Sequence, residues 1–302
     1  MHAEGRRNSM VKSAEKFREN IPNMFCDPVL LNIEGLYTPF EYCLTIKPGI
    51  IDKEKLHELQ ENEYDEAPVY DQDSERVWGL VNTEYLKDLF EKNKPLLTHD
   101  PNIKLDECRY YIDVHVALDE LLEKMAHMRG ILLFPKSHLS KHETEVRPVG
   151  LMTISDLNRH PLRLTLYSLL AKLESDLATF VKQYSSDSWD WLEKLNEEDQ
   201  VQILGYWELS KKKGVNIGPI AATTLSQLIN IVARNKDFRQ RLGFGSSNEY
   251  HNYTGKIPGL RNCIMHPVRP LILDQQSVGN VFKIVKSITD LNKRIEKACI
   301  IH

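Results

Sequence analysis

The sequence predicts an α+β protein in which a tandem α/β repeat is followed by an all-helical, up-and-down bundle. Up to about residue 160, short apolar runs alternate with amphipathic segments, and one order of elements occurs twice. After Pro161 the strand signals end and apolar residues recur at helical spacing, with one helix expected to begin at Pro219. We therefore expect an N-terminal extension over residues 1–25, the repeat over 26–160 and the helical bundle over 161–302.

The size and the cysteine content narrow the class of protein. A chain of 302 residues with 41% hydrophobic residues can bury a large core, and its length favours about two domains. The five cysteines are odd in number and lie far apart without a C-x-x-C pair, which predicts neither a disulfide framework nor a cysteine zinc site. Neither a signal peptide pattern nor a run of about 18 apolar residues is found. These features predict a cytoplasmic protein.

One supersecondary unit, in the order helix, strand, strand, helix, is predicted twice. Residues 52–93 contain it first, and residues 116–160 contain it again with a longer polar loop between the strands. Superposing VWGLVNTEYLKDL on PVGLMTISDLNRH aligns Gly79 with Gly150, Leu80 with Leu151, and Leu86 with Leu157. Each unit is too small to bury its apolar faces alone, so we expect the two units to stack.

The second repeat ends in a strand-to-helix turn that contains Thr153 and Asp156. A hydroxyl at the strand end and a carboxylate three residues later can both hydrogen-bond a ribose, and the nearby helix N-terminus attracts phosphate. The same residues are also explained without a ligand, as a capping box in which Thr153 caps the helix. Taken alone, the two residues leave both interpretations open.

The repeat, together with Gly150, Thr153 and Asp156, resembles the CBS domain pair over residues 26–160. This resemblance implies a cleft between the units that holds an adenosyl ligand such as AMP, ATP or S-adenosylmethionine. Gly150, Thr153 and Asp156 are then the ligand-binding positions, the last two at the ribose. The first repeat departs from the pattern, because Asn82 and Tyr85 stand where the hydroxyl and the aspartate are expected. Its cleft is therefore expected to be altered, empty or purely structural.

Charge is unevenly distributed along the chain, although the formal net charge is only −4. Between residues 211 and 270 the acidic residues are Asp237 and Glu249, against Lys211, Lys212, Lys213, Arg234, Lys236, Arg239, Arg241, Lys256, Arg261 and Arg269. Such a segment favours a nucleic acid partner, and its candidate RNA contacts are Arg234, Lys236, Arg239, Arg241 and Arg269. The alternative is an ordinary solvated face.

The stretch IPGLRNCIMHPVRPLI, residues 257–272, combines an arginine, an amide and a histidine between prolines. Pro258 can start a short helix, and Pro267 disfavours helical geometry at His266. Asn262 and His266 then share a face of this helix, and the Arg261 guanidinium beside them can bind a phosphate through two hydrogen bonds. His266 can titrate near neutral pH, as proton transfer requires. The alternative is a surface histidine beside a proline and an arginine satisfied by helix carbonyls.

The same stretch resembles the signature of the HEPN superfamily, in which an arginine and a polar residue precede a histidine just before the last long helix. Four residues separate Arg261 from His266 here. The resemblance implies a metal-independent endoribonuclease that leaves a 2′,3′-cyclic phosphate. His266 would act as general acid or base, Arg261 would stabilise the phosphorane, and Asn262 would position one of them. It also implies a site at a twofold dimer interface, and Glu174 on the preceding long helix is a weaker catalytic candidate or a surface glutamate.

These observations lead to one main hypothesis and two alternatives. The main hypothesis is an adenine-nucleotide-regulated endoribonuclease that needs no cofactor and works as a homodimer. The first alternative is a non-catalytic nucleotide sensor whose helical domain binds RNA or a protein. The second alternative is a purely structural partner of another enzyme, favoured if Arg261 and His266 are buried and paired within one chain.

Overall fold

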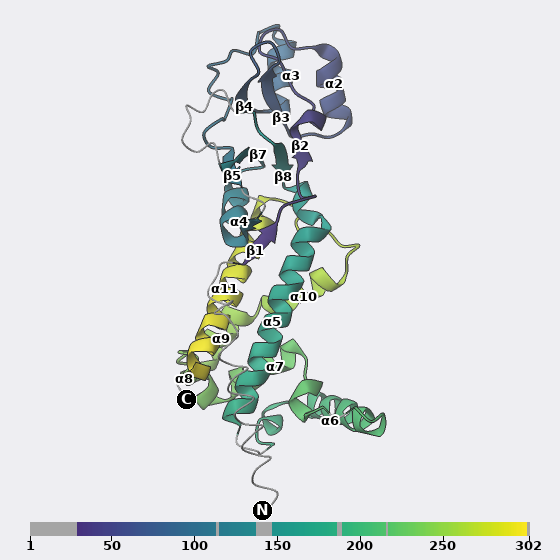
Figure 1. Cartoon of the computed structure of the whole chain (residues 1–302), viewed down its shortest axis with the longest axis vertical. Helices are drawn as coiled ribbons and strands as arrows, with labels where there is room; N and C mark the ends of the chain where they lie inside the picture. The colour runs from purple at the N-terminus through teal and green to yellow at the C-terminus, as the bar shows by residue number, and fades with distance from the viewer. Residues whose placement is uncertain (1–28, 113–114, 137–146, 186–188, 216, 301–302) are drawn as a thin grey trace, which may run out of the picture.

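The computed structural model describes residues 29–112, 115–136, 147–185, 189–215 and 217–300. The expected N-terminal extension, residues 1–25, lies outside the described residues. The fold-class prediction is confirmed, because a mixed α/β part is followed by a mostly helical part. The molecule is elongated, with the α/β part at one end and the helices extending away from it (Figure 1).

The α/β part contains the predicted unit twice. The first copy consists of α2 (Lys53–Glu61), β3 (Glu66–Asp71), β4 (Arg76–Asn82) and α3 (Thr83–Glu91). The second copy consists of α4 (Leu118–His127), β7 (Gly130–Pro135), β8 (Gly150–Thr153) and the short 3-10 helix η4 (Ser155–Asn158). The remaining elements are β1 (Leu30–Asn32), β2 (Thr38–Pro39), η1 (Phe40–Tyr42), β5 (Arg109–Ile112) and β6 (His115–Ala117).

Strand pairing shows that the two copies are built alike. The first strand of each hairpin has a parallel neighbour, Ile46 against Val69 in one copy and β5 against β7 in the other. The second strand of each hairpin has an antiparallel neighbour at the aligned leucines, Leu80 against Lys104 and Leu151 against Thr38. The four-stranded sheet has the order β2-β8-β7-β5. The pairing therefore confirms the alignment of Leu80 with Leu151.

Gly79 and Gly150 occupy equivalent crowded positions. A Cβ at Gly79 would lie 2.8 Å from the backbone of Lys104, and Gly79 has a φ of +136°. A Cβ at Gly150 would lie 2.7 Å from the carbonyl oxygen of Thr38 and 2.2 Å from the ring of Tyr37. In both copies a neighbouring segment of backbone approaches the hairpin so closely that no side chain fits.

The helical part is dominated by two long helices, α5 (His160–Tyr184) and α11 (Gln275–Ile300). Between them the chain forms η5 (Leu192–Lys194), α6 (Glu197–Lys212), η6 (Pro219–Ala222), α7 (Leu225–Arg234), α8 (Lys236–Arg241), α9 (Ser247–Thr254) and α10 (Ile257–Met265). The sequence predicts one helix starting at Pro219, and this prediction is wrong. The chain forms a 3-10 turn at Pro219 and restarts at Leu225, because Thr224 and Gln227 make a capping box.

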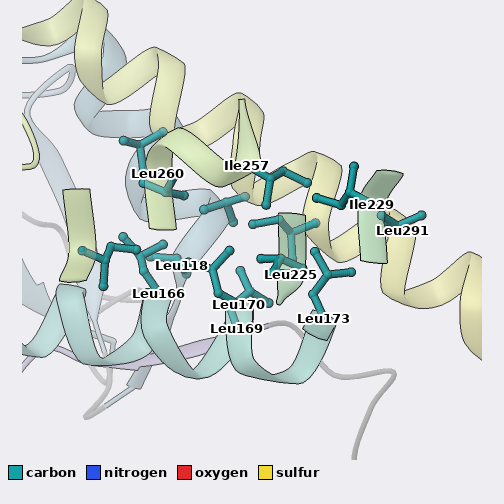
Figure 2. Close-up of a cluster of buried hydrophobic side chains, with 14 of the residues drawn as sticks. Leu118, Leu166, Leu169, Leu170, Leu173, Leu225, Ile229, Ile257, Leu260 and Leu291 are labelled. Atoms are coloured by element: carbon teal, nitrogen blue, oxygen red, sulfur yellow. The ribbon is translucent and has the colours of Figure 1, made fainter. Parts of the chain in front are cut away.

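One hydrophobic core joins both parts of the molecule. Figure 2 shows Leu118 of α4 beside Leu166, Leu169 and Leu170 of α5, with Leu260 of α10 facing them. Helix α11 packs against both α4 and α5. The helical part and the second α/β unit are therefore held together by shared apolar burial, the dominant favourable term in folding.

Replacing Gly150 with alanine is expected to destabilise the protein by about 2 kcal/mol or more, because the new Cβ meets backbone that cannot move cheaply. Urea unfolding followed by circular dichroism measures the change. The matched control is Gly205→Ala in α6, where a Cβ meets nothing within 4 Å. This substitution is expected to raise the free energy of unfolding by about 0.5–1 kcal/mol. Equal effects of the two substitutions would contradict the crowding at Gly150.

Candidate functional site

Helix α10 presents the arginine, the amide and the histidine at its C-terminal end. The helix is anchored by Ile257, Leu260 and Ile264, which are buried, and Pro258 lies in its first turn. His266 is the residue that caps the helix, directly before Pro267, as the sequence predicts. The opposite face of the helix is thus left to the polar residues.

The three polar side chains differ in exposure but share one property. Arg261 is half-buried, whereas Asn262 and His266 are exposed. Within the part of the chain that the structure describes, none of the three side chains makes a hydrogen bond or an ion pair. A guanidinium, an amide and an imidazole that remain available can together bind and protonate an anionic group such as a phosphodiester.

The segment that follows α10 is attached to α5 by a buried arginine. Arg163 is 6% exposed and donates from Nη1 to the carbonyl oxygen of Cys263 at 3.0 Å. Its Nη2 donates to the carbonyl oxygen of Arg269. The chain between these two acceptors contains His266, so one guanidinium holds both ends of the segment that carries the histidine.

A second attachment comes from Asn158 in η4. Its Oδ1 accepts from the backbone N–H groups of Leu271 at 2.7 Å and Ile272 at 2.9 Å. Its Nδ2 donates to the carbonyl oxygen of Ile272 at 2.8 Å. These three hydrogen bonds connect the end of the α/β part to the chain just beyond His266.

The other candidates for RNA chemistry lie in different places. Arg269 is exposed on the same segment as His266. Arg234, Lys236, Arg239 and Arg241 lie in and beside α8, near the end of α11, whereas α10 lies closer to the α/β part (Figure 1). Three of these cations already contact the protein. Arg234 and Arg239 donate to the carbonyl oxygens of Lys194 and Ala233, and Arg241 lies 4.2 Å from the ring centre of Tyr184. These cations are close to the α10 motif in sequence but lie apart from it in the structure.

Glu174 lies halfway along α5 and is half-buried. Its carboxylate makes no hydrogen bond or ion pair with the residues that the structure describes. Its neighbours on α5, Lys172 and Asp176, are instead paired with each other, and Lys172 also contacts Glu296 of α11. Glu174 therefore remains available, and no hydrogen bond or ion pair among the described residues joins it to Arg261 or His266.

Thr153 and Asp156 contact each other at the end of β8. Asp156 is buried, and its carboxylate accepts from the Thr153 N–H at 2.7 Å and from the Thr153 hydroxyl at 2.9 Å. Arg159 pairs with the same carboxylate at 2.6 Å. Burial raises the pKa of the nearby Cys43 thiol to about 11, and the negative charge of Asp156 adds to the shift. A ribose at this turn would have to share a carboxylate that already serves the fold.

The corresponding positions of the first repeat serve local structure. Asn82 caps α3 by accepting from the N–H groups of Glu84 and Tyr85. The Tyr85 hydroxyl donates to Asp100 at 2.6 Å. The departures from the ligand-binding pattern in this repeat are thus explained by helix capping and by one side-chain hydrogen bond.

Arg163, Asn158 and Arg159 are polar residues of the site region that the sequence argument missed. Their partners are remote in sequence, with Arg163 and Cys263 separated by 100 positions. One signal was present, because Arg163 falls on the leucine stripe of α5, three residues before Leu166 and seven before Leu170. A charged residue on a stripe that must be buried indicates a buried polar contact.

No protein-family model and no curated protein matches the chain. Among solved structures, a crystal structure of CbpB from Streptococcus agalactiae is similar, with a TM-score of 0.32 and 12% sequence identity. The match covers 46% of this chain and 82% of that chain. This distant similarity to part of the chain is too low to define a function.

Among the helices that the structure describes, none combines the length and apolar character that a membrane span requires. Over the same described ranges, histidine, cysteine and acidic side chains form no cluster of three or more suited to a metal ion.

Replacing Asp156 with alanine is expected to lower the free energy of unfolding by about 1–3 kcal/mol, because the Thr153 N–H loses its partner and the Arg159 guanidinium loses its carboxylate contact. Urea unfolding is the measurement. Asp106→Ala is the matched control: Asp106 is exposed and should change the free energy by less than about 0.5 kcal/mol. A neutral Asp156→Ala would show that the turn does not depend on this carboxylate.

Proposed function

We propose that this protein is an adenine-nucleotide-regulated, metal-independent endoribonuclease with its active site at the end of α10. The observation that carries the proposal is the availability of Arg261, Asn262 and His266 together at one helix end. A purely structural role is disfavoured, because that role requires Arg261 and His266 to be buried and paired. The resemblance of this stretch to the HEPN signature supplies the reaction type.

In the proposed reaction the 2′-hydroxyl of RNA attacks the adjacent phosphorus and the bond to the 5′-oxygen breaks. One histidine must take the proton from the 2′-hydroxyl, and one must give a proton to the departing 5′-oxygen. The planar guanidinium of Arg261 donates hydrogen bonds to the phosphorane oxygens, on which negative charge develops. Asn262 orients the phosphate or the imidazole. The products are a 2′,3′-cyclic phosphate and a 5′-hydroxyl.

Two proton transfers fit a homodimer, in which two copies of His266 face one substrate. The surface around His266 supports this part of the proposal. Met265, Val268 and Leu273 are 49%, 93% and 76% exposed, an unusual concentration of apolar side chains on one short exposed segment. A second copy of the chain would cover them and bring the two motifs together.

Regulation is proposed to come from an adenosyl ligand at the second repeat, with Gly150, Thr153 and Asp156 as its contacts. The repeat and the resemblance to CBS pairs support this part. A route for coupling is also available, since Asn158 lies two residues beyond Asp156 and bonds the chain at Leu271 and Ile272. A ligand that moves the Asp156 turn would therefore move the segment that carries His266.

The alternative function is a non-catalytic nucleotide sensor that binds RNA or a protein. The separation of the α8 cations from α10 favours it, because RNA held at α8 would not need the motif. In that case Arg261 and His266 would be structural residues, or would contact a phosphate without catalysing its cleavage.

The nuclease proposal is tested by incubating purified protein with cellular RNA in the presence of a metal chelator. Cleavage with cyclic phosphate ends is expected, and His266→Ala should lower the rate by about a hundredfold or more, the scale of general acid–base catalysis. The matched control is His251→Ala, which removes an exposed histidine of α9 and should leave the rate unchanged. RNA binding without cleavage under every condition would favour the sensor instead.

Ligand binding is tested separately by titrating AMP, ATP and S-adenosylmethionine into the protein in a calorimeter. At least one ligand is expected to bind, and Thr153→Val should weaken it by about tenfold through the loss of one hydroxyl contact. Thr98→Val, an exposed threonine outside the turn, is the control. If none of the three ligands binds the unmodified protein, the regulatory part of the proposal fails.

A further inference from the structure

The middle of the segment that carries His266 is not held by apolar burial, although Ile264, Leu271 and Ile272 at its two ends are buried in the core. Every residue from Met265 to Pro270 is exposed. Within the segment, the Arg269 N–H donates to the carbonyl oxygen of His266 at 3.0 Å and closes a turn. Pro267 and Pro270 restrict the backbone further. These local features give the segment a shape but do not fix its position on the protein.

Its position is set by contacts at both ends, where hydrogen bonds from two remote side chains add to the burial of Ile264, Leu271 and Ile272. Arg163 binds the carbonyl oxygens of Cys263 and Arg269, on either side of His266. Asn158 then binds Leu271 and Ile272 through three further hydrogen bonds. Both side chains come from elements that precede α10 by about a hundred residues, and Arg163 is a buried residue of α5.

The chemistry of arginine explains why this residue type suits position 163. Arg163 has no carboxylate partner among the described residues, so its charge is balanced by carbonyl oxygens. A buried cation without a counter-ion is costly, which makes the residue poorly suited to a role that an apolar side chain could fill. Its planar fork, however, can reach two carbonyl groups in different directions, whereas a lysine ammonium is a single point charge.

We propose that Arg163 and Asn158 are positioning residues that hold the 264–272 segment so that His266 and Arg261 face the same phosphate. The inference rests on the proposed nuclease function, because it assigns the two residues a role in that site. Neither side chain touches substrate. Each acts through the backbone of the segment, and a displacement of about 1 Å at His266 is enough to lower the rate by about a hundredfold.

The test uses the full chain with Arg163→Met, Arg163→Lys and Asn158→Ala, each assayed in two ways. The first readout is hydrogen exchange of the peptide covering residues 264–273, expected to become about tenfold faster in Arg163→Met and Asn158→Ala. The second is RNA cleavage, in which kcat is expected to fall by about ten- to a hundredfold with KM nearly unchanged. Arg163→Lys should give an intermediate effect in both.

Arg294→Met is the matched control, because Arg294 also donates to a carbonyl oxygen, that of Leu242, in a different region. Arg294→Met should leave the hydrogen exchange of residues 264–273 and the kcat of RNA cleavage unchanged, even if it lowers overall stability. Should Arg163→Met fail to fold, Arg163→Lys and Asn158→Ala still decide the matter.

The two readouts separate the possible failures. Unchanged exchange in folded variants overturns the inference, because the two residues then do not hold the segment. Faster exchange with unchanged kcat also overturns it, because the position of the segment then does not matter. If the unmodified protein cuts no RNA, the proposed function fails, and the positioning role for catalysis falls with it, while the exchange data still show whether the residues anchor the segment.

Discussion

The leucine stripe of α5 is the constraint on which the rest of the structure depends. A helix of 25 residues that buries Leu162, Leu166, Leu173 and Leu177 needs apolar partners along its whole length. It obtains them from α11, α7, α10 and β1, all of which pack against it. Since α11 also packs against α4, the burial of one stripe unites the helical part with the second α/β unit.

Much of this fold could be predicted because its signals are local. The hairpins, the repeated order of elements and the glycines at Gly79 and Gly150 follow from short patterns, and the strand pairing confirms them. The errors arose where two local signals competed. Pro219 is a good first residue of a helix, yet the capping box at Thr224 starts the helix later. The turn after Thr153 forms η4, and the long helix starts at His160, with Pro161 in its first turn.

The candidate site was only partly predictable, for a different physical reason. The limits of α10 are local, set by Pro258 and Pro267, and the sequence predicts them well. The contacts that place its end are not local, because Arg163 and Asn158 meet partners about a hundred residues away. Proximity in sequence was also misleading, since the cations of α8 share a basic segment with Arg261 but lie elsewhere in the molecule. A single sequence contains no signal for such distances.

The packing of α11 against α4 also has a consequence for the order of events during synthesis. Leu118, Leu121, Leu122 and Met125 of α4 emerge from the ribosome more than 150 residues before α11 is made. Until then these side chains lack the helix that covers them. At a synthesis rate of about 5–20 residues per second, this interval lasts on the order of ten seconds. The growing chain therefore exposes an apolar surface for that time, which makes it a natural client for chaperones that bind nascent proteins.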